Sequence, residues 1–246
     1  MMLHPVIITG TPRSGIWLTA GAFQVSGGFS GLLDKVENHP TGEVENMEIR
    51  DRMERPLLEG LGFEPRGLGQ LPTTEQIQKL APTMKEQWRL LVDQMFKQQN
   101  CQDTAVRFIA SQVACLLWPL WNAAFPEAKW IIVRRNETDI MASCRATGFI
   151  RSYRNPGDSS RRVRSDKELH LLLDGYRTRF EQMQIANLNF TEFWPQLVYD
   201  GRLGPLQKLL ESHGLAWCPE VTEFVRPFLW KHGTLQIEGV DHATYN

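Results

Sequence analysis

Short apolar runs alternate with longer segments in which apolar residues recur every three or four positions. The short runs are rich in β-branched residues and bounded by turn-forming residues, a pattern typical of strands. The run from Trp130 to Val133 has no polar alternation, as expected for a strand covered on both faces. The pattern predicts four strands, at Pro5–Thr9, Thr104–Ile109, Lys129–Arg134 and Gln196–Asp200.

The longer segments predict helices. In one of them, Leu169, Leu172, Tyr176, Phe180 and Met183 form a stripe that is typical of a helix face turned toward the core. The predicted helices are Trp17–Val25, Glu45–Leu61, Met84–Lys97, Gln112–Ala124, Glu137–Ala146, Lys167–Ile185 and Pro205–His213.

Strands that alternate with helices predict an α/β fold with a parallel sheet and right-handed crossovers. The stretch from Gly10 to Ile109 is too long for one crossover, so we expect a helical insertion at about residues 38–100. No repeat or low-complexity linker interrupts the 246 residues, and we expect a single domain over 1–246.

Composition and charge argue against several classes of function. Lys and Arg number 27 against 28 Asp and Glu, so no chain-wide basic field favours nucleic acid, and any anion site must be local. The four cysteines form no CxxC pair, which argues against zinc and against a disulfide framework. No segment approaches the roughly 18 apolar residues that span a bilayer. We therefore expect a cytoplasmic protein that binds neither membrane nor nucleic acid.

The first predicted strand leads through a turn into a helix. Gly10 and Gly15 have the spacing of a Walker loop, and such a turn directs backbone N–H groups and the positive end of a helix at one anion. Ile16 and Trp17, however, stand where a nucleotide triphosphatase has Lys and Ser or Thr. The usual magnesium ligand is therefore missing, and Arg13 is the cation of the loop. The pattern predicts an anion site without a metal.

A second motif follows the third predicted strand. The strand ends in Arg134 and Arg135, and Asn136 is a good N-cap for the next helix, with Asp139 in the capping-box position. Ligands bind at the carboxyl ends of such strands, and arginines there suit phosphate. Ser143 lies eight residues after Arg135. An arginine on a solvated strand end is the alternative interpretation.

Both motifs resemble those of sulfotransferases that use 3′-phosphoadenosine 5′-phosphosulfate. The segment Thr11–Gly15 resembles their 5′-phosphosulfate loop, although Ile16 and Trp17 replace its hydroxyl residues. The strand, Arg135 and Ser143 resemble the element that holds the 3′-phosphate, with Glu137 in place of a proline. The resemblance implies the P-loop-like sulfotransferase fold, this nucleotide as donor, and donor-binding residues Arg13, Ser14, Gly15, Ile16, Trp17, Arg135 and Ser143.

The resemblance extends to a candidate base. Residues 38–46 resemble a bacterial sulfotransferase segment, and Glu45 matches its Glu. The resemblance implies that Glu45 takes the acceptor's proton while Arg13 offsets charge on the leaving oxygen. Glu37 and His39 compete for the first role, and Glu45 could instead cap or solvate a helix. Arg107 either lines the acceptor site or pairs with a local carboxylate.

Acceptor identity is not readable from the sequence. Residues 145–167 carry seven basic side chains against Asp158 and Asp166, which suits either a flap over an anion or a solvated loop. We expect sulfuryl transfer to a hydroxyl or amine of a small molecule or carbohydrate. A non-catalytic nucleotide-binding protein on the same scaffold is the main alternative, and a degenerate P-loop kinase is a weaker one. Nothing in the sequence indicates the oligomeric state.

Overall fold

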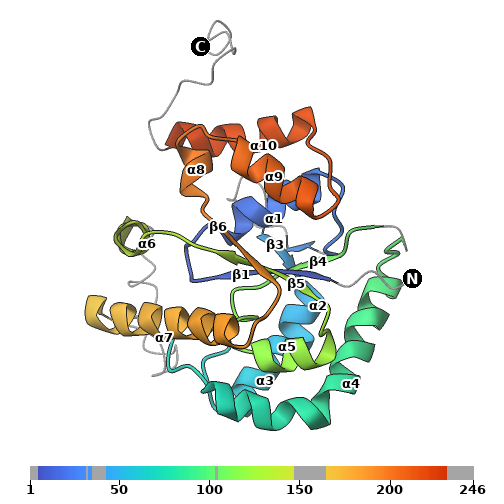
Figure 1. Cartoon of the computed structure of the whole chain (residues 1–246). Coiled ribbons are helices and arrows are strands. Elements are labelled where there is room, and N and C mark those ends of the chain that lie inside the picture. The colour runs from blue at the N-terminus through green and yellow to red at the C-terminus, as the bar shows by residue number, and fades with distance from the viewer. Residues whose placement is uncertain (1–4, 32, 35–42, 103–104, 147–164, 232–246) are drawn as a thin grey trace, which may run out of the picture.

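Four parallel strands form the central sheet in the order β4–β1–β5–β6 (Figure 1). The computed structural model describes residues 5–31, 33–34, 43–102, 105–146 and 165–231. The strands are β1 (Val6–Gly10), β4 (Phe108–Ala110), β5 (Lys129–Val133) and β6 (Phe190–Phe193). Their shared direction places all four carboxyl ends at one edge of the sheet, which confirms the predicted α/β architecture.

Helices cover both faces of the sheet. Ile8, Ile131 and Val133 point to the face that packs against α1 (Ile16–Val25), α8 (Gln196–Tyr199), α9 (Gly204–Ser212) and α10 (Pro219–Lys231). Ile7 and Ile132 point to the opposite face. The helices α4 (Thr74–Gln98), α5 (Trp118–Ala124) and α7 (Asp166–Ile185) lie on that side (Figure 1). A strand buried on both faces needs no polar alternation, as the sequence of β5 predicts.

The chain between α1 and β4 holds the insertion. It contains an antiparallel pair, β2 (Leu33–Asp34) and β3 (Glu43–Asn46), followed by α2 (Met47–Ile49), the π-helix η1 (Arg50–Glu54), α3 (Arg55–Gly60) and α4 (Thr74–Gln98). The helix predicted from Glu45 begins two residues later, because the side chain of Asn46 accepts hydrogen bonds from the N–H groups of Glu48 and Ile49.

The predicted start of α4 at Met84 is wrong by ten residues. The helix begins at Thr74 because Thr73 and Gln76 form a capping box, and it continues through Pro82. The predicted start of α5, at Gln112, is instead too early. Residues 112–117 form turns, and the helix begins at Trp118 with Pro119 in its first turn.

The fourth predicted strand, Gln196–Asp200, is also wrong. Residues Gln196–Tyr199 form α8, and the strand is instead Phe190–Phe193. Pro195 starts the helix with φ near −58°, where its ring fixes the backbone. Among the described strands this one pairs with β5 alone, and such an edge strand tolerates exposed polar residues like Thr191 and Glu192.

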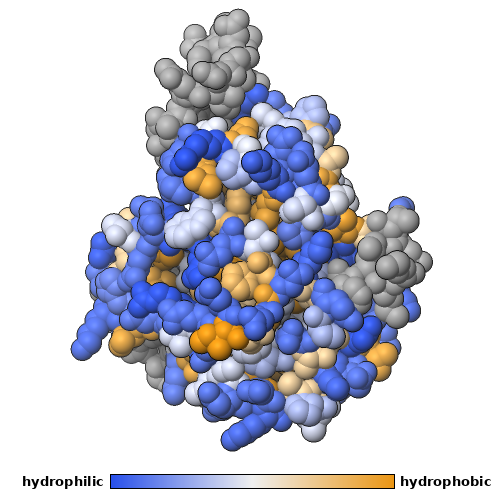
Figure 2. Space-filling view, in the orientation of Figure 1, coloured by the Kyte–Doolittle hydropathy of each residue, from blue (hydrophilic) through white to orange (hydrophobic). Residues whose placement is uncertain are grey.

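Two further helices are confirmed to within one residue of their predicted starts, whereas the strand predicted at Thr104–Ile109 is shorter and spans Phe108–Ala110. Helix α6 spans Glu137–Ala146 as predicted, and α7 begins one residue before its predicted start. The apolar stripe of α7 is buried, as its period requires. The opposite side of α7 carries exposed Leu171 and Ile185, and Figure 2 shows apolar surface over this helix on a mostly hydrophilic face. In the part of the chain that the structure describes, no helix combines the length and apolarity needed to cross a bilayer.

Candidate anion-binding site

The loop after β1 forms a tight turn that leads directly into α1. The N–H of Ser14 donates to the carbonyl of Thr11 at 3.2 Å, Arg13 has φ of +64° and Gly15 has φ of +102°. No side chain caps α1, which begins immediately after Gly15. The unpaired N–H groups of its first turn and the positive end of its dipole are therefore available to an anion.

Two glycines make this turn possible. A Cβ on Gly10 would lie 2.5 Å from Oγ of Ser14 and 2.6 Å from the carbonyl oxygen of Val133. A Cβ on Gly15 would lie 2.9 Å from Cγ of Pro195, in a backbone region that side chains rarely adopt. Both positions need glycine, because the loop is packed against the end of β5 and the start of α8.

The side chains around Arg13 in this loop turn inward. Ser14 is fully buried, and its hydroxyl faces Gly10 without a hydrogen-bond partner. Ile16 is buried and Trp17 half-buried, and both pack with the core beside α1. Any contribution of Ile16 and Trp17 to anion binding is thus limited to their backbone N–H groups, while the N–H of Ser14 already donates to the carbonyl of Thr11.

The end of β5 presents two arginines with different surroundings. Arg134 donates to Glu192 with Nη2 at 2.7 Å, and its guanidinium lies 4.6 Å from the centre of the Phe180 ring. Arg135 lies 5.8 Å from the centre of the Tyr199 ring and donates from Nη1 to the carbonyl of Arg13 at 3.1 Å. Arg134 is therefore satisfied within the fold, whereas Arg135 turns toward the first loop.

The two predicted motifs meet in space. Nε of Arg13 donates to Oγ of Ser143 at 3.1 Å, across 130 residues of sequence. Among the described residues, neither Arg13 nor Arg135 forms an ion pair with a carboxylate, and Nε of Arg135 is buried without a hydrogen-bond partner. Within the described ranges, two adjacent cations without a counter-charge lie beside a helix N-terminus, an arrangement that suits a multiply charged anion.

Two titratable groups beside the arginines, Cys144 and Tyr199, add no negative charge. Burial raises the pKa of the Cys144 thiol to about 11, although Arg13 and Arg135 oppose that shift. Burial also raises the pKa of Tyr199, against the influence of the same two arginines. Both groups are therefore neutral near pH 7 and supply no negative charge to the site.

The structure places Glu45 in β3 rather than in a helix. Its side chain is 12% exposed, and Oε2 lies 3.5 Å from Nη1 of Arg50. A helix-capping role for Glu45 is excluded, since Asn46 is the residue that caps α2. The competing bases Glu37 and His39 lie outside the described residues, as does most of the basic segment 145–167.

Arg107 does not line the ligand edge of the sheet. It precedes β4, so it lies at the amino end of that strand, with Nη1 3.9 Å from Asp93 and its guanidinium over Phe96. The pairing with a local carboxylate is therefore the correct alternative. The carboxyl end of β4 presents Ser111 instead, which sequence reasoning missed.

Ser111 belongs to a buried polar cluster. Its hydroxyl donates to Oε2 of Glu54 at 2.6 Å, and the indole Nε1 of Trp121 donates to Oε1 at 3.1 Å. Burial raises the pKa of the fully enclosed Glu54 to about 7. In the sequence, Glu54 is one of several charged residues between Arg50 and Arg55, and only the fold separates it from its exposed neighbours.

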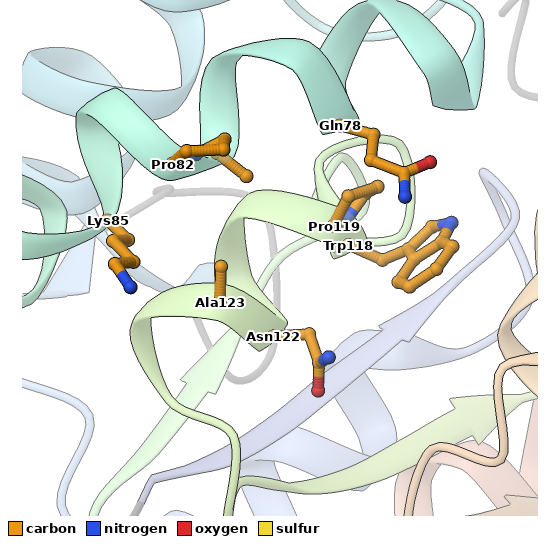
Figure 3. A pocket seen from close by; sticks show the side chains of 8 residues that line it. Gln78, Pro82, Lys85, Trp118, Pro119, Asn122 and Ala123 are labelled. Carbon is orange, nitrogen blue, oxygen red and sulfur yellow. The ribbon is translucent and has the colours of Figure 1, made fainter.

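A cavity of about 290 Å³ lies elsewhere, between α4 and α5 (Figure 3). Its walls include Gln78, Pro82, Lys85, Trp118 and Asn122, and neither arginine of the anion site lines it. Within the described ranges, no three His, Cys, Asp or Glu side chains gather in a way that could hold a metal ion.

Comparison with solved structures identifies the fold. The sulfotransferase domain from the curacin biosynthetic pathway aligns with a TM-score of 0.55 at 12% identity, covering 91% of this chain and 78% of that one. Sulfotransferase STF9 from Mycobacterium avium aligns with a TM-score of 0.48 at 14% identity, covering 95% of this chain and 69% of STF9. No protein-family model and no curated protein matches the sequence. The chain has a sulfotransferase-like fold.

Proposed function

We propose that this chain is a sulfotransferase that moves a sulfuryl group from 3′-phosphoadenosine 5′-phosphosulfate to a hydroxyl or amine of a small molecule or carbohydrate. The observation that carries the proposal is the meeting of Arg13, Arg135 and Ser143 through the two 3.1 Å hydrogen bonds. A donor with anionic groups at both its 5′ and 3′ positions needs two linked anion sites, and these residues come from two separate strand ends.

The donor fits the residues present. The backbone N–H groups from Arg13 to Leu18 would hold the 5′ end, and Arg135 with Ser143 would hold the 3′-phosphate. The buried Nε of Arg135, which has no hydrogen-bond partner among the residues that the structure describes, supports a ligand on this side chain. Desolvating a charged donor is costly, and an anionic ligand would offset that cost.

The residues then have distinct tasks in an in-line displacement. The acceptor's oxygen or nitrogen forms a bond to sulfur while the bond from sulfur to the nucleotide oxygen breaks, and the electron pair leaves with the bisphosphate. Arg13 would offset the charge that grows on that oxygen. Glu45, whose Oε2 lies 3.5 Å from Nη1 of Arg50, would accept the acceptor's proton.

Ligand-dependent unfolding tests the proposal. Adenosine 3′,5′-bisphosphate should raise the melting temperature without added metal, because a ligand that binds only the folded state stabilises it. ATP with magnesium should have a smaller effect. Stabilisation by ATP and magnesium alone would contradict the proposal and favour a kinase-like site.

The loop also supports a second candidate, a nucleotide-binding protein without catalysis. Ile16 and Trp17 bring no hydroxyl to the site, and Ser14 turns its hydroxyl inward. A fold does not guarantee its activity. Tight bisphosphate binding, together with no consumption of the sulfated donor across a panel of phenols, alcohols and amines, would favour this candidate.

A further inference from the structure

Helix α8, which belongs to neither motif, packs against both halves of the anion-binding site. Pro195 immediately precedes this helix and Tyr199 is its last residue, about one turn later. A Cβ on Gly15 would lie 2.9 Å from Cγ of Pro195 and 3.4 Å from the hydroxyl oxygen of Tyr199, so both side chains pack on the loop after β1. In a strand these two residues would be about 13 Å apart, too far to contact the same glycine.

The ring of Tyr199 also contacts the second half of the site. Its centre lies 5.8 Å from Cζ of Arg135, within the range in which an aromatic face attracts a guanidinium. Tyr199 is only 5% exposed, and such an attraction is stronger when water is excluded. Burial raises the pKa of the Tyr199 hydroxyl, against the influence of Arg135 and Arg13. The ring is therefore neutral near pH 7, and the attraction comes from its face rather than from a phenolate.

Two contacts thus restrict the side chain of Arg135 before any ligand binds. Nη1 donates to the carbonyl of Arg13 at 3.1 Å, and the ring of Tyr199 attracts the guanidinium. A guanidinium carries five N–H donors in a rigid plane, so a ring at its face leaves donors at its edge for a phosphate. We propose that Tyr199 is a positioning residue that holds Arg135 in the orientation that binds the 3′-phosphate, an inference that rests on the proposed function.

Such positioning should affect one class of ligand and not another. An arginine that is already oriented loses less conformational entropy when it binds a phosphate, so affinity rises. In the proposed function only the 3′-phosphate contacts Arg135, whereas the 5′ end lies on the N–H groups of the loop. The ratio of the affinities for adenosine 3′,5′-bisphosphate and adenosine 5′-monophosphate therefore reports on Arg135. A displaced loop would instead weaken the binding of both nucleotides.

The neighbouring arginine offers a matched control. The guanidinium of Arg134 lies 4.6 Å from the centre of the Phe180 ring and pairs with Glu192. Phe180 is 1% exposed, so Phe180→Leu and Tyr199→Leu each remove a buried aromatic ring from beside an arginine. Only Tyr199→Leu should change the affinity ratio, because Arg134 has no place in the proposed nucleotide site.

Calorimetry with both nucleotides on each variant measures this ratio. Tyr199→Leu should lower it by about three- to tenfold, the range expected for a partly desolvated contact between a cation and a ring. Tyr199→Phe keeps the ring and should stay within about twofold of wild type, as should Phe180→Leu. When Arg135→Ala is already present, Tyr199→Leu should not change the ratio further, because the side chain that it positions is gone.

Fluorination of the ring separates its attraction for the cation from its packing. A phenylalanine with three ring fluorines, incorporated at position 199, nearly keeps the shape of the ring but withdraws electron density from its face. This protein should show the lowered ratio of Tyr199→Leu, with the unfluorinated Tyr199→Phe as its reference. Because the ring still fills its place in the core, this measurement decides the question even if Tyr199→Leu does not fold.

The outcomes separate this inference from the proposed function. A wild-type protein that does not prefer the bisphosphate to the monophosphate would refute the proposed donor, and this inference with it. A preference that Arg135→Ala abolishes but the fluorinated ring leaves intact would overturn the role of Tyr199 alone. Equal losses for both nucleotides in Tyr199→Leu would do the same, because they would show that the ring only supports the loop.

Discussion

At the scale of single residues, two adjacent arginines at the end of β5 have different partners. Arg134 contacts a carboxylate and an aromatic face. Arg135 contacts a backbone carbonyl and an aromatic ring, and no carboxylate of the described residues pairs with it. Guanidinium groups pair strongly with phosphate when nothing else neutralises them. The same residue type at neighbouring positions therefore has a structural role in one case and suits ligand binding in the other.

Arg135→Ala should weaken binding of adenosine 3′,5′-bisphosphate by roughly ten- to hundredfold, because a charged hydrogen bond contributes about 1.5–3 kcal/mol. Binding of adenosine 5′-monophosphate, which lacks the 3′-phosphate, should change little. Calorimetry with both nucleotides measures this. Arg134→Ala is the control and should leave the ratio of the two affinities unchanged. Equal losses for both nucleotides in Arg135→Ala would refute the assignment.

The buried Glu54 predicts a pH-dependent stability. Below about pH 4.5 the carboxyl is neutral in both folded and unfolded chains. As pH rises toward about 7, the unfolded chain ionises this group and the folded chain does not, so the free energy of unfolding falls by about 3 kcal/mol. Above that pH the loss levels off.

Urea denaturation from pH 4.5 to 8 measures this dependence, and Glu54→Gln should lack it. The difference between the two proteins isolates Glu54 from the other titrating groups. A constant difference in stability across this range would show that the folded-state pKa is not raised.

Glu45 is the predicted base that lies in the described structure. Glu45→Gln keeps the shape of the side chain, and should lower turnover by about 10²–10⁴ while leaving bisphosphate affinity unchanged. Rate and affinity are measured on the same preparation, with thermal unfolding to verify the fold. Full activity in Glu45→Gln, with Glu37→Gln or His39→Asn inactive, would move the base to that neighbour.

At the scale of elements, the turn from β1 into α1 depends on Gly15. Gly15→Ala would place a methyl group 2.9 Å from Pro195 with φ of +102°, so the loop or the start of α8 must shift. We expect a loss of about 1–3 kcal/mol in stability, and loss of bisphosphate binding because the N–H groups of the loop no longer converge. Denaturation and calorimetry test the two effects separately, and unchanged nucleotide affinity would contradict the second.

Elements with strong local signals are predictable from the sequence. Helix α6 has a buried strand before it and a cap residue at its start, and its bounds agree with the prediction. The segment of α8 has β-branched and aromatic residues but forms a helix, because Pro195 starts one and β6 already occupies the sheet edge. The local sequence pattern does not show which segment pairs with the sheet.

The candidate site also contains residues that the sequence predicts and residues that it does not. Arg13, Arg135 and Ser143 lie in motifs with fixed spacing beside strand ends, so their meeting follows from parallel pairing of β1 with β5. Glu54 and Ser111 lie in no motif. Their contact, 57 residues apart in sequence, depends on how the π-helix packs against α5 and the end of β4. Tertiary packing alone makes Glu54 differ from exposed Glu59.

At the scale of the whole molecule, the net charge of −1 makes the anion site a local feature. Two arginines and a helix terminus would bind the nucleotide without a general basic field. Because Ile16 and Trp17 supply no hydroxyl ligand, bisphosphate binding should need no divalent cation. Calorimetry with and without a chelator should give the same affinity. A chelator that abolished binding would indicate a metal-assisted, kinase-like site.

The place of β1 in the sheet has a consequence for synthesis on the ribosome. Its apolar residues pair with β4 and β5, and Gly10 is in register with Val133, roughly 120 residues later. At about 5–20 residues per second, β1 emerges on the order of ten seconds before its partners. The nascent chain therefore carries an unpaired, largely apolar strand until Phe108 and the rest of β4 have been made. The loop that follows this strand reaches its final form only after Val133, against which Gly10 packs, has been made.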